Sequence, residues 1–231
     1  MTAVRPPLLL LAVPADAGEQ ADLLAERLSK RLVAEGVEVL SSSPGPDAPG
    51  PGPVGVPLVL LAAGWEAPAG RRVARPFGPH PTLLRLLEER VDAALAGAGR
   101  ADSAVVLVGH GPDEPQANAE TVKVARMLWE GRGFGLVEPA FVQAGPSVEA
   151  ALERCRRLGA ERAVVVPYSL FTPLGPMPTS GLADVRAAAP VGDCDGLADL
   201  VLERYAEVLD GDLRSNCNSC FYRPKFTAHA H

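Results

Sequence analysis

An internal repeat is the feature that most restricts how this chain of 231 residues can fold. Residues 72–90 (RVARPFGPHPTLLRLLEER) and 186–204 (RAAAPVGDCDGLADLVLER) share a strand ending in Pro-x-Gly, a polar turn and an apolar helix, at a constant offset of 114. Leu8–Val13 aligns in the same way with Val105–His110, at an offset of 97. Self-similarity of this kind indicates two half-chains built on one plan. The first half is then 17 residues shorter than the second.

The missing residues have an evident location in the first half. Ser41–Pro57 is rich in proline and glycine, and it stands where the second half has its predicted helix Ser147–Leu158. A tract of this composition cannot supply a helix. We therefore expect a reduced lobe over residues 1–100, a complete lobe over residues 101–213 and a flexible tail over residues 214–231.

Strand and helix patterns alternate along the second half. Val105–Val108 and Ala163–Val166 are short β-branched runs bounded by turn residues, and a further strand is expected within Phe134–Val142. Ala119–Glu130 has helical periodicity, with Val122 on the apolar face. Strands that alternate with helices indicate parallel sheets with crossover helices, and so an α/β fold.

Charge and composition restrict the class of partner. The formal net charge of −6 argues against nucleic acid or an anionic membrane as the main partner, so a small molecule is expected. The apolar N-terminal run is too short for a membrane span or a signal peptide, and four cysteines without an export signal do not indicate disulfides. We expect a cytoplasmic protein, monomeric or homodimeric. Two arginine clusters are candidate anion sites: Arg71, Arg72 and Arg75, and Arg154, Arg156 and Arg157.

His110 is the main candidate for chemistry. It follows a buried strand, and ligands of open α/β sheets bind at the carboxyl ends of their strands. Imidazole is a suitable ligand for Co²⁺, Fe²⁺ and Ni²⁺ and titrates near neutral pH, so His110 is predicted to be both metal ligand and catalytic residue. Gly109 and Gly111 permit a tight turn and the approach of a flat ligand. Asp113 and Glu114 either orient the imidazole or lie on an exposed loop.

Further candidate metal ligands lie in a turn and in the tail. His80 stands in a Gly-Pro-His-Pro turn, and Cys194 is its partner in the repeat; each is a candidate ligand or a plain turn residue. Cys217 and Cys220 form a Cys-x-x-Cys pair that holds zinc or an iron–sulfur cluster only with additional ligands. The alternative for this pair is a floppy terminus with incidental thiols.

Four segments in order resemble one known family. The segments VLVGHGPDEPQAN, PSVEAALERCRRLGAERAVVVPYSLF, GDCDGLADLVLERY and CNSCFYR are similar to the sirohydrochlorin cobaltochelatases and ferrochelatases of the class II chelatase superfamily, over Arg72–Arg223. The resemblance implies two tandem flavodoxin-like lobes facing each other across a cleft. It also implies that Gly109, Gly111 and Tyr168 contact a tetrapyrrole, and that the Cys-x-x-Cys tail belongs to a cluster or metal store.

The resemblance further implies an enzyme of the lyase class that needs neither ATP nor an organic cofactor. It would insert cobalt or iron, with nickel as a further candidate, into a sirohydrochlorin-type tetrapyrrole in cobalamin or siroheme biosynthesis. Two-lobed members carry a metal-binding histidine in the first lobe, where this chain has Val13 and Pro14, and a second histidine in a loop that corresponds to Thr172–Ser180, which has none. A non-catalytic relative that binds a tetrapyrrole or carries a metal is therefore the alternative function.

Overall fold

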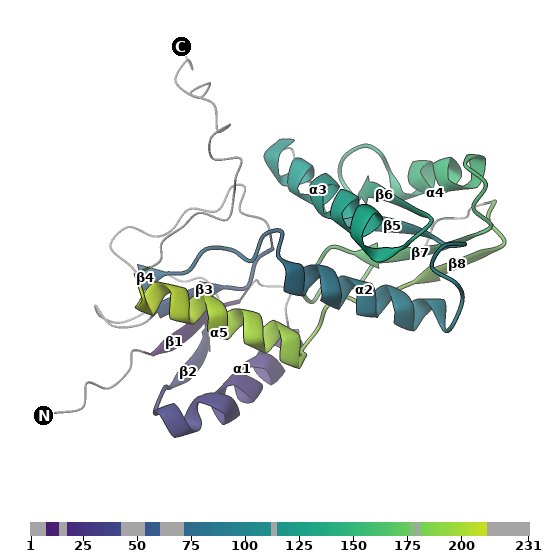
Figure 1. Cartoon of the computed structure of the whole chain (residues 1–231). Helices are drawn as coiled ribbons and strands as arrows, with labels where there is room; N and C mark the ends of the chain where they lie inside the picture. The colour runs from purple at the N-terminus through teal and green to yellow at the C-terminus, as the bar shows by residue number, and fades with distance from the viewer. Residues whose placement is uncertain are drawn as a thin grey trace, which may run out of the picture.

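The described part of the chain forms two parallel sheets with helices packed around them, as the computed structural model shows (Figure 1). The predicted α/β class with two lobes of parallel sheet is confirmed. The described residues are 8–13, 18–42, 54–60, 72–111, 115–176, 178 and 181–211. The predicted tail at residues 214–231, with Cys217 and Cys220, lies outside them.

The sheet of the first half, sheet A, has the strand order β2-β1-β3-β4, with every neighbouring pair parallel. Leu9 and Leu11 are fully buried, because alternate side chains of a strand point to the same face. An amphipathic helix and a short 3-10 helix follow β1, and the amphipathic helix packs against β2. The elements are β1 (Leu9–Ala12), α1 (Gly18–Leu32), η1 (Val33–Glu35), β2 (Val39–Ser42), β3 (Val54–Pro57) and β4 (Arg72–Val73).

The sheet of the second half, sheet B, has the equivalent order β6-β5-β7-β8. All six residues of β5 are buried, as expected for a parallel strand covered on both faces. Helix α3 packs against β5 and β6, and α4 covers the opposite face, where it forms a separate apolar cluster with Val106 and Val108. The elements are β5 (Ala104–Gly109), α3 (Pro115–Arg132), β6 (Leu136–Phe141), α4 (Val148–Arg157), β7 (Arg162–Pro167) and β8 (Asp184–Ala187).

The last helix of each half packs on the sheet of the other half. Helix α2 (Pro81–Leu95) ends the first half and contacts β7 and β8, whereas α5 (Asp195–Leu209) ends the second half and contacts β3. Figure 1 shows α5 across the first lobe and α2 between the lobes. We propose that residues 1–100 and 101–213 are the two repeat units, each of which gives its last helix to the other lobe.

The exchanged helices create one continuous apolar core that spans both lobes. This core includes Leu11 of sheet A, Val166 of sheet B, Leu87 of α2 and Val201 of α5, all 1% exposed or less. At about 25 cal/mol per Å² of buried apolar surface, these side chains supply the main stabilisation of the pair of lobes. Each sheet therefore buries one of its faces against a helix from the other half of the chain.

Two arginines at equivalent repeat positions strengthen this exchange. Arg90 of α2 donates to the carbonyl oxygen of Val191, with Nε 3.1 Å away, and Arg204 of α5 donates from Nη2 to the carbonyl oxygen of Phe77 at 3.4 Å. Both donors and both acceptors are related by the predicted offset of 114, and α2 and α5 each contain 15 residues. The repeat predicted for this part of the chain is therefore confirmed.

The offset predicted for the first strands is wrong by one residue. The Leu58 N–H donates to the carbonyl oxygen of Ala12, just as the Tyr168 N–H donates to that of Val108, so β1 and β5 correspond at an offset of 96. The first-half counterpart of His110 is therefore Pro14, which lies outside the described residues. Both strands are uniform apolar runs, in which a shift of one residue leaves the pattern almost unchanged.

Two further details differ from the sequence prediction. The tract Ser41–Pro57 supplies the end of β2 and all of β3, and only the residues between these strands lie outside the described part of the chain. Val122 is 45% exposed, and the buried face of α3 is formed by Ala117, Thr121, Val124, Ala125 and Leu128. Helix α3 begins four residues before the predicted start, and with this extra turn its buried residues follow a helical face that does not include Val122.

No helix in the described ranges is long and apolar enough to cross a bilayer.

Replacing Arg204 with alanine is expected to destabilise the fold strongly. Its guanidinium is 1% exposed and also donates to Glu207 at 2.8 Å, so the change removes a buried charge from its partners and leaves a cavity. We expect a loss of about 3 kcal/mol in the free energy of unfolding, measured by urea denaturation.

Arg157→Ala is the matched control, because Arg157 makes an exposed pair with Glu153 and should change stability by about 0.5 kcal/mol or less. Equal effects of the two substitutions would contradict the role of Arg204 in joining the lobes.

Candidate functional site

His110 lies at the carboxyl edge of sheet B, immediately after β5. Its side chain is exposed, and its carbonyl oxygen accepts from the Gln143 N–H at 3.0 Å, which extends the pairing of β5 with the segment after β6. Side chains alternate along β5, so position 110 falls on the same face as Val106 and Val108, the face that α4 covers. The structure therefore places the imidazole at the edge where ligands of parallel sheets bind.

The two glycines beside His110 are required by contacts within the protein. Gly111 has a φ of +74°, and a Cβ there would lie 2.6 Å from Cβ of Phe141. A Cβ at Gly109 would lie 2.8 Å from Oγ1 of Thr121 in α3. The left-handed backbone at Gly111 favours glycine, and the predicted tight turn stays a prediction because the three residues after Gly111 lie outside the described part of the chain. The close approach that both glycines allow is to the β6 and α3 side chains, and contact with a flat substrate stays a prediction.

A pocket of about 270 Å³ opens at the same edge, on the α4 face of sheet B. Val108 and Val165 come from the central strands, and the first turn of α4 and the loop after β7 form the other walls. Its size is near the lower end of typical ligand pockets, so it would hold part of a large ligand rather than all of it. The lining residues are Val108, Phe141, Val142, Ser147, Val148, Glu149, Val165, Leu174, Gly175, Pro176 and Pro178.

A larger hollow of about 820 Å³ lies at the opposite, amino edge of sheet B. Its two arginines already have acidic partners, because Arg154 pairs with Glu138 at 2.8 Å and Arg162 with Asp184 at 3.2 Å. Ligands of parallel sheets bind at the carboxyl edge, so we assign the site to the smaller pocket in spite of its size.

Two of the predicted metal ligands are histidines within the described residues. Of these two, only His110 has both ring nitrogens without a contact to another described residue. No cluster of three or more His, Cys, Asp or Glu side chains suited to a metal occurs in the described ranges. A metal held at His110 by the described part of the chain therefore has fewer than three protein ligands and takes its other ligands from water or substrate. Such a site binds metal more weakly than a closed three- or four-ligand site.

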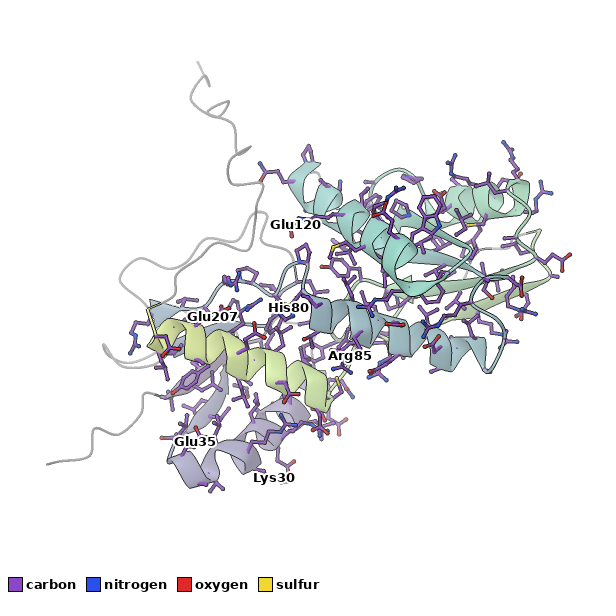
Figure 2. All side chains as sticks on the ribbon, in the orientation of Figure 1. Lys30, Glu35, His80, Arg85, Glu120 and Glu207 are labelled. Carbon is purple, nitrogen blue, oxygen red and sulfur yellow. The ribbon has the colours of Figure 1, made fainter. Side chains whose placement is uncertain are left out.

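His80 has a structural position at the start of α2, where it is the N-cap residue. Its Nδ1 accepts from the Thr82 N–H at 3.2 Å, and its Nε2 lies 3.3 Å from Oε1 of Glu203 in α5. Figure 2 shows His80 at this helix start, beside the α5 helix that carries Glu207. Both ring nitrogens are therefore engaged, and the ring can bind a metal only by giving up one of these contacts. Cys194, its repeat partner, is likewise the N-cap residue of α5.

Tyr168 lies in the main core and not on the surface of the pocket. It follows β7, is 6% exposed, and its hydroxyl has no hydrogen-bond partner among the described residues. Burial and the nearby Glu120 carboxylate raise the pKa of Tyr168 well above its usual value, so the phenol stays protonated. Its contact with substrate stays a prediction.

The described arginines of the two predicted anion sites already have partners within the protein. Arg72 donates to the carbonyl oxygen of Val208, and Arg75 pairs with Glu207. Arg154 pairs with Glu138, whereas Arg156 and Arg157 both pair with Glu153. The hydrogen bonds from Arg156 and Arg157 lower the pKa of Glu153 to about 2. A ligand carboxylate would have to compete with these partners.

Five of the predicted or discussed site residues lie outside the described residues, and nothing follows for them from the fold. They are Arg71, Asp113, Glu114, Cys217 and Cys220. Zinc or iron–sulfur binding by the Cys-x-x-Cys pair therefore stays a prediction.

Sequence reasoning missed the pocket-lining residue Glu149. In the sequence, Glu149 is recognisable only as a residue at the start of a predicted helix. In the structure, Ser147 caps this helix, α4, by accepting from the Ala150 N–H at 3.2 Å. The available signal was the order of elements, because the loop from β6 to α4 leaves the same carboxyl edge as His110.

Comparison with known proteins links this site to one family. The CbiX family model matches residues 104–174, which contain His110 and most of the residues that line the pocket. A curated sirohydrochlorin cobaltochelatase of Priestia megaterium is 30% identical over 168 residues, covering 67% of this chain and 55% of the relative. A chloroplastic sirohydrochlorin ferrochelatase of Arabidopsis thaliana is 37% identical over 76 residues, covering 32% of this chain and 33% of the relative. The chain thus spans about half the length of the first relative.

A solved structure supports the fold over most of the chain. SirB from Bacillus subtilis with Fe³⁺ superposes with a TM-score of 0.66 at 18% identity, covering 90% of this chain and 98% of SirB. At this identity the likeness concerns the fold of the two lobes.

Replacing Gly111 with alanine is expected to destabilise the protein by about 2 kcal/mol or more, because the left-handed backbone and the overlap with Phe141 both disfavour a Cβ. The control is Gly131→Ala, at a helical position with open space around it, which should stabilise by about 0.5 kcal/mol. Urea denaturation of both variants tests this, and an unchanged stability of Gly111→Ala would contradict it.

The cap at His80 is expected to make stability depend on pH. Burial is the main cause that lowers its pKa from 6.5, with the charges of Arg204 and Arg75 adding to it and Glu203 opposing it. The unfolded chain then binds the proton more readily, so this contribution is complete above about pH 6.5 and is lost as the pH falls through the native pKa.

His80→Asn keeps a capping oxygen and should flatten the dependence of the free energy of unfolding on pH between 7.5 and 5. Parallel curves for wild type and His80→Asn would contradict this assignment.

Proposed function

We propose that this chain, which belongs to the sirohydrochlorin chelatase family, inserts a divalent metal ion into a sirohydrochlorin-type tetrapyrrole without ATP. The observation that carries the proposal is the coincidence of three features in the second half of the chain. These are the family match, the exposed His110 at the carboxyl end of β5, and the pocket at the same edge of sheet B.

His110 is proposed to hold the incoming metal before insertion. Imidazole binds Co²⁺ and Fe²⁺ well, and water fills the remaining coordination positions. A site with one protein ligand suits delivery, because the metal has to leave it for the macrocycle. As the four ring nitrogens replace the water ligands, the metal passes from His110 to the macrocycle.

The apolar pocket is proposed to seat one edge of the tetrapyrrole. Its walls contain valine, leucine, phenylalanine and proline side chains and no basic residue among those described, so it favours the hydrocarbon edge of a ring over a carboxylate substituent. The carboxylates of the macrocycle would then remain in water, which agrees with the engagement of the nearby arginines by acidic residues. This orientation brings the ring centre toward His110.

The metal is proposed to be cobalt or iron, with the product serving cobalamin or siroheme biosynthesis. The proposal rests on the relatives, one described as a cobaltochelatase and one as a ferrochelatase. A single imidazole does not choose between these ions, because their selection depends on coordination geometry and supply.

The test is metal insertion followed by the absorbance change of sirohydrochlorin on addition of Co²⁺ or Fe²⁺ under anaerobic conditions. Purified protein should accelerate the change above the uncatalysed rate with at least one of the two metals. Folded protein that binds metal and tetrapyrrole without accelerating insertion would overturn the proposal and favour a carrier.

Replacing His110 with alanine should lower kcat/KM for insertion by about 100-fold or more, because the metal loses its protein ligand. The side chain is exposed, so the melting temperature should stay near that of wild type. The comparison variant is His80→Asn, which keeps the cap of α2 and should retain most of the activity. Loss of activity in His80→Asn with retention in His110→Ala would reverse the assignment of the two histidines.

A further inference from the structure

Metal insertion needs a proton acceptor as well as a metal ligand. The neutral macrocycle carries two pyrrole N–H groups, and both protons leave when the nitrogens bind a divalent ion. While His110 donates a ring lone pair to the metal, that lone pair cannot accept a proton. If the proposed function holds, the site therefore has a use for a second group near the ring nitrogens.

Glu149 is the only ionisable side chain among the described residues that line the pocket. It stands in the first turn of α4, two residues after the cap residue Ser147. The remaining lining side chains are apolar, apart from the Ser147 hydroxyl, which accepts from the Ala150 N–H. A macrocycle seated in the pocket thus meets one basic oxygen centre on its wall.

The Glu149 carboxylate is also unengaged, unlike the next glutamate of the same helix. No described residue forms an ion pair or hydrogen bond with the Glu149 side chain, and the residue is exposed. Glu153, one turn later, is held by Arg156 at 2.7 Å and by Arg157 at 2.7 Å. Contact with solvent would let Glu149 pass an accepted proton to water.

We propose that Glu149 is a catalytic residue of the insertion reaction and accepts a proton from a pyrrole nitrogen. In this step the N–H bond breaks, its electron pair remains on nitrogen and forms the bond to the metal, and the proton moves to a carboxylate oxygen of Glu149. Glu149 then releases the proton to water, and the second pyrrole proton leaves in the same way. No oxidant, reductant or nucleotide takes part.

The decisive variant is Glu149→Gln, which keeps the shape of the side chain and removes the basic oxygen. It should lower kcat about 100-fold and leave KM for the tetrapyrrole within about threefold, because general base catalysis typically contributes 10²–10⁴ in rate. Glu153→Gln is the matched control, since it makes the same change on the same helix outside the pocket and should keep wild-type kcat.

A second measurement separates a base from a metal ligand. Titration with Co²⁺ alone should give the same affinity for Glu149→Gln and wild type, whereas a tenfold or greater loss of affinity would make Glu149 a metal ligand and overturn the proposal. A third measurement separates a base from a merely structural residue. Glu149→Ala should recover activity in proportion to added acetate, with no such recovery in His110→Ala, and absence of recovery would also overturn it.

These results are distinguishable from a failure of the proposed function itself. If wild-type protein inserts metal and Glu149→Gln does so at the same rate, the role of Glu149 is refuted and the chelatase function stands. If wild-type protein does not insert metal, the chelatase function is refuted. Because an acidic residue in the first turn also stabilises a helix, the melting temperature of each variant is measured alongside.

Discussion

The exchange of the two last helices is the constraint on which the rest of this structure depends. Helix α2 covers sheet B and α5 covers sheet A, so each sheet buries its inner face against a helix encoded in the other half. Apolar burial drives this arrangement, and the contacts of Arg90 and Arg204 with opposite carbonyl groups fix it in register. The two lobes consequently share one apolar core.

The two halves differ on the outer face of their sheets, which the exchanged helices leave uncovered. In the second half α4 packs on the outer face of sheet B, and its first turn forms one wall of the pocket. In the first half no equivalent helix occurs among the described residues, which leave out residues 43–53 between β2 and β3. The pocket is formed by a helix start and strand ends that all belong to the second half.

The chemistry proposed for the site depends on the small number of ionisable groups among its described residues. A resident metal is held by three or four protein ligands, whereas a metal that is a substrate has to be released to the macrocycle. In the proposed reaction, the exposed imidazole of His110 holds the ion, and the carboxylate of Glu149, on the wall of an apolar pocket at the same sheet edge, accepts protons. His80, a candidate ligand by sequence, instead caps α2 and contacts Glu203 of α5, and so links the exchanged helices.

The sequence by itself determined the two-part α/β plan, the strand that leads to His110, and the equivalence of α2 and α5. These depend on hydrophobic periodicity, β-branched runs and turn residues, all of which act over short stretches of chain. Only the tertiary structure decided that the last helices are exchanged, that the first strands correspond at an offset of 96, and that Glu149 lines a pocket at the carboxyl edge of sheet B. Each of these results depends on packing between segments distant in sequence, where a shift of one residue turns a side chain to the other face of a sheet.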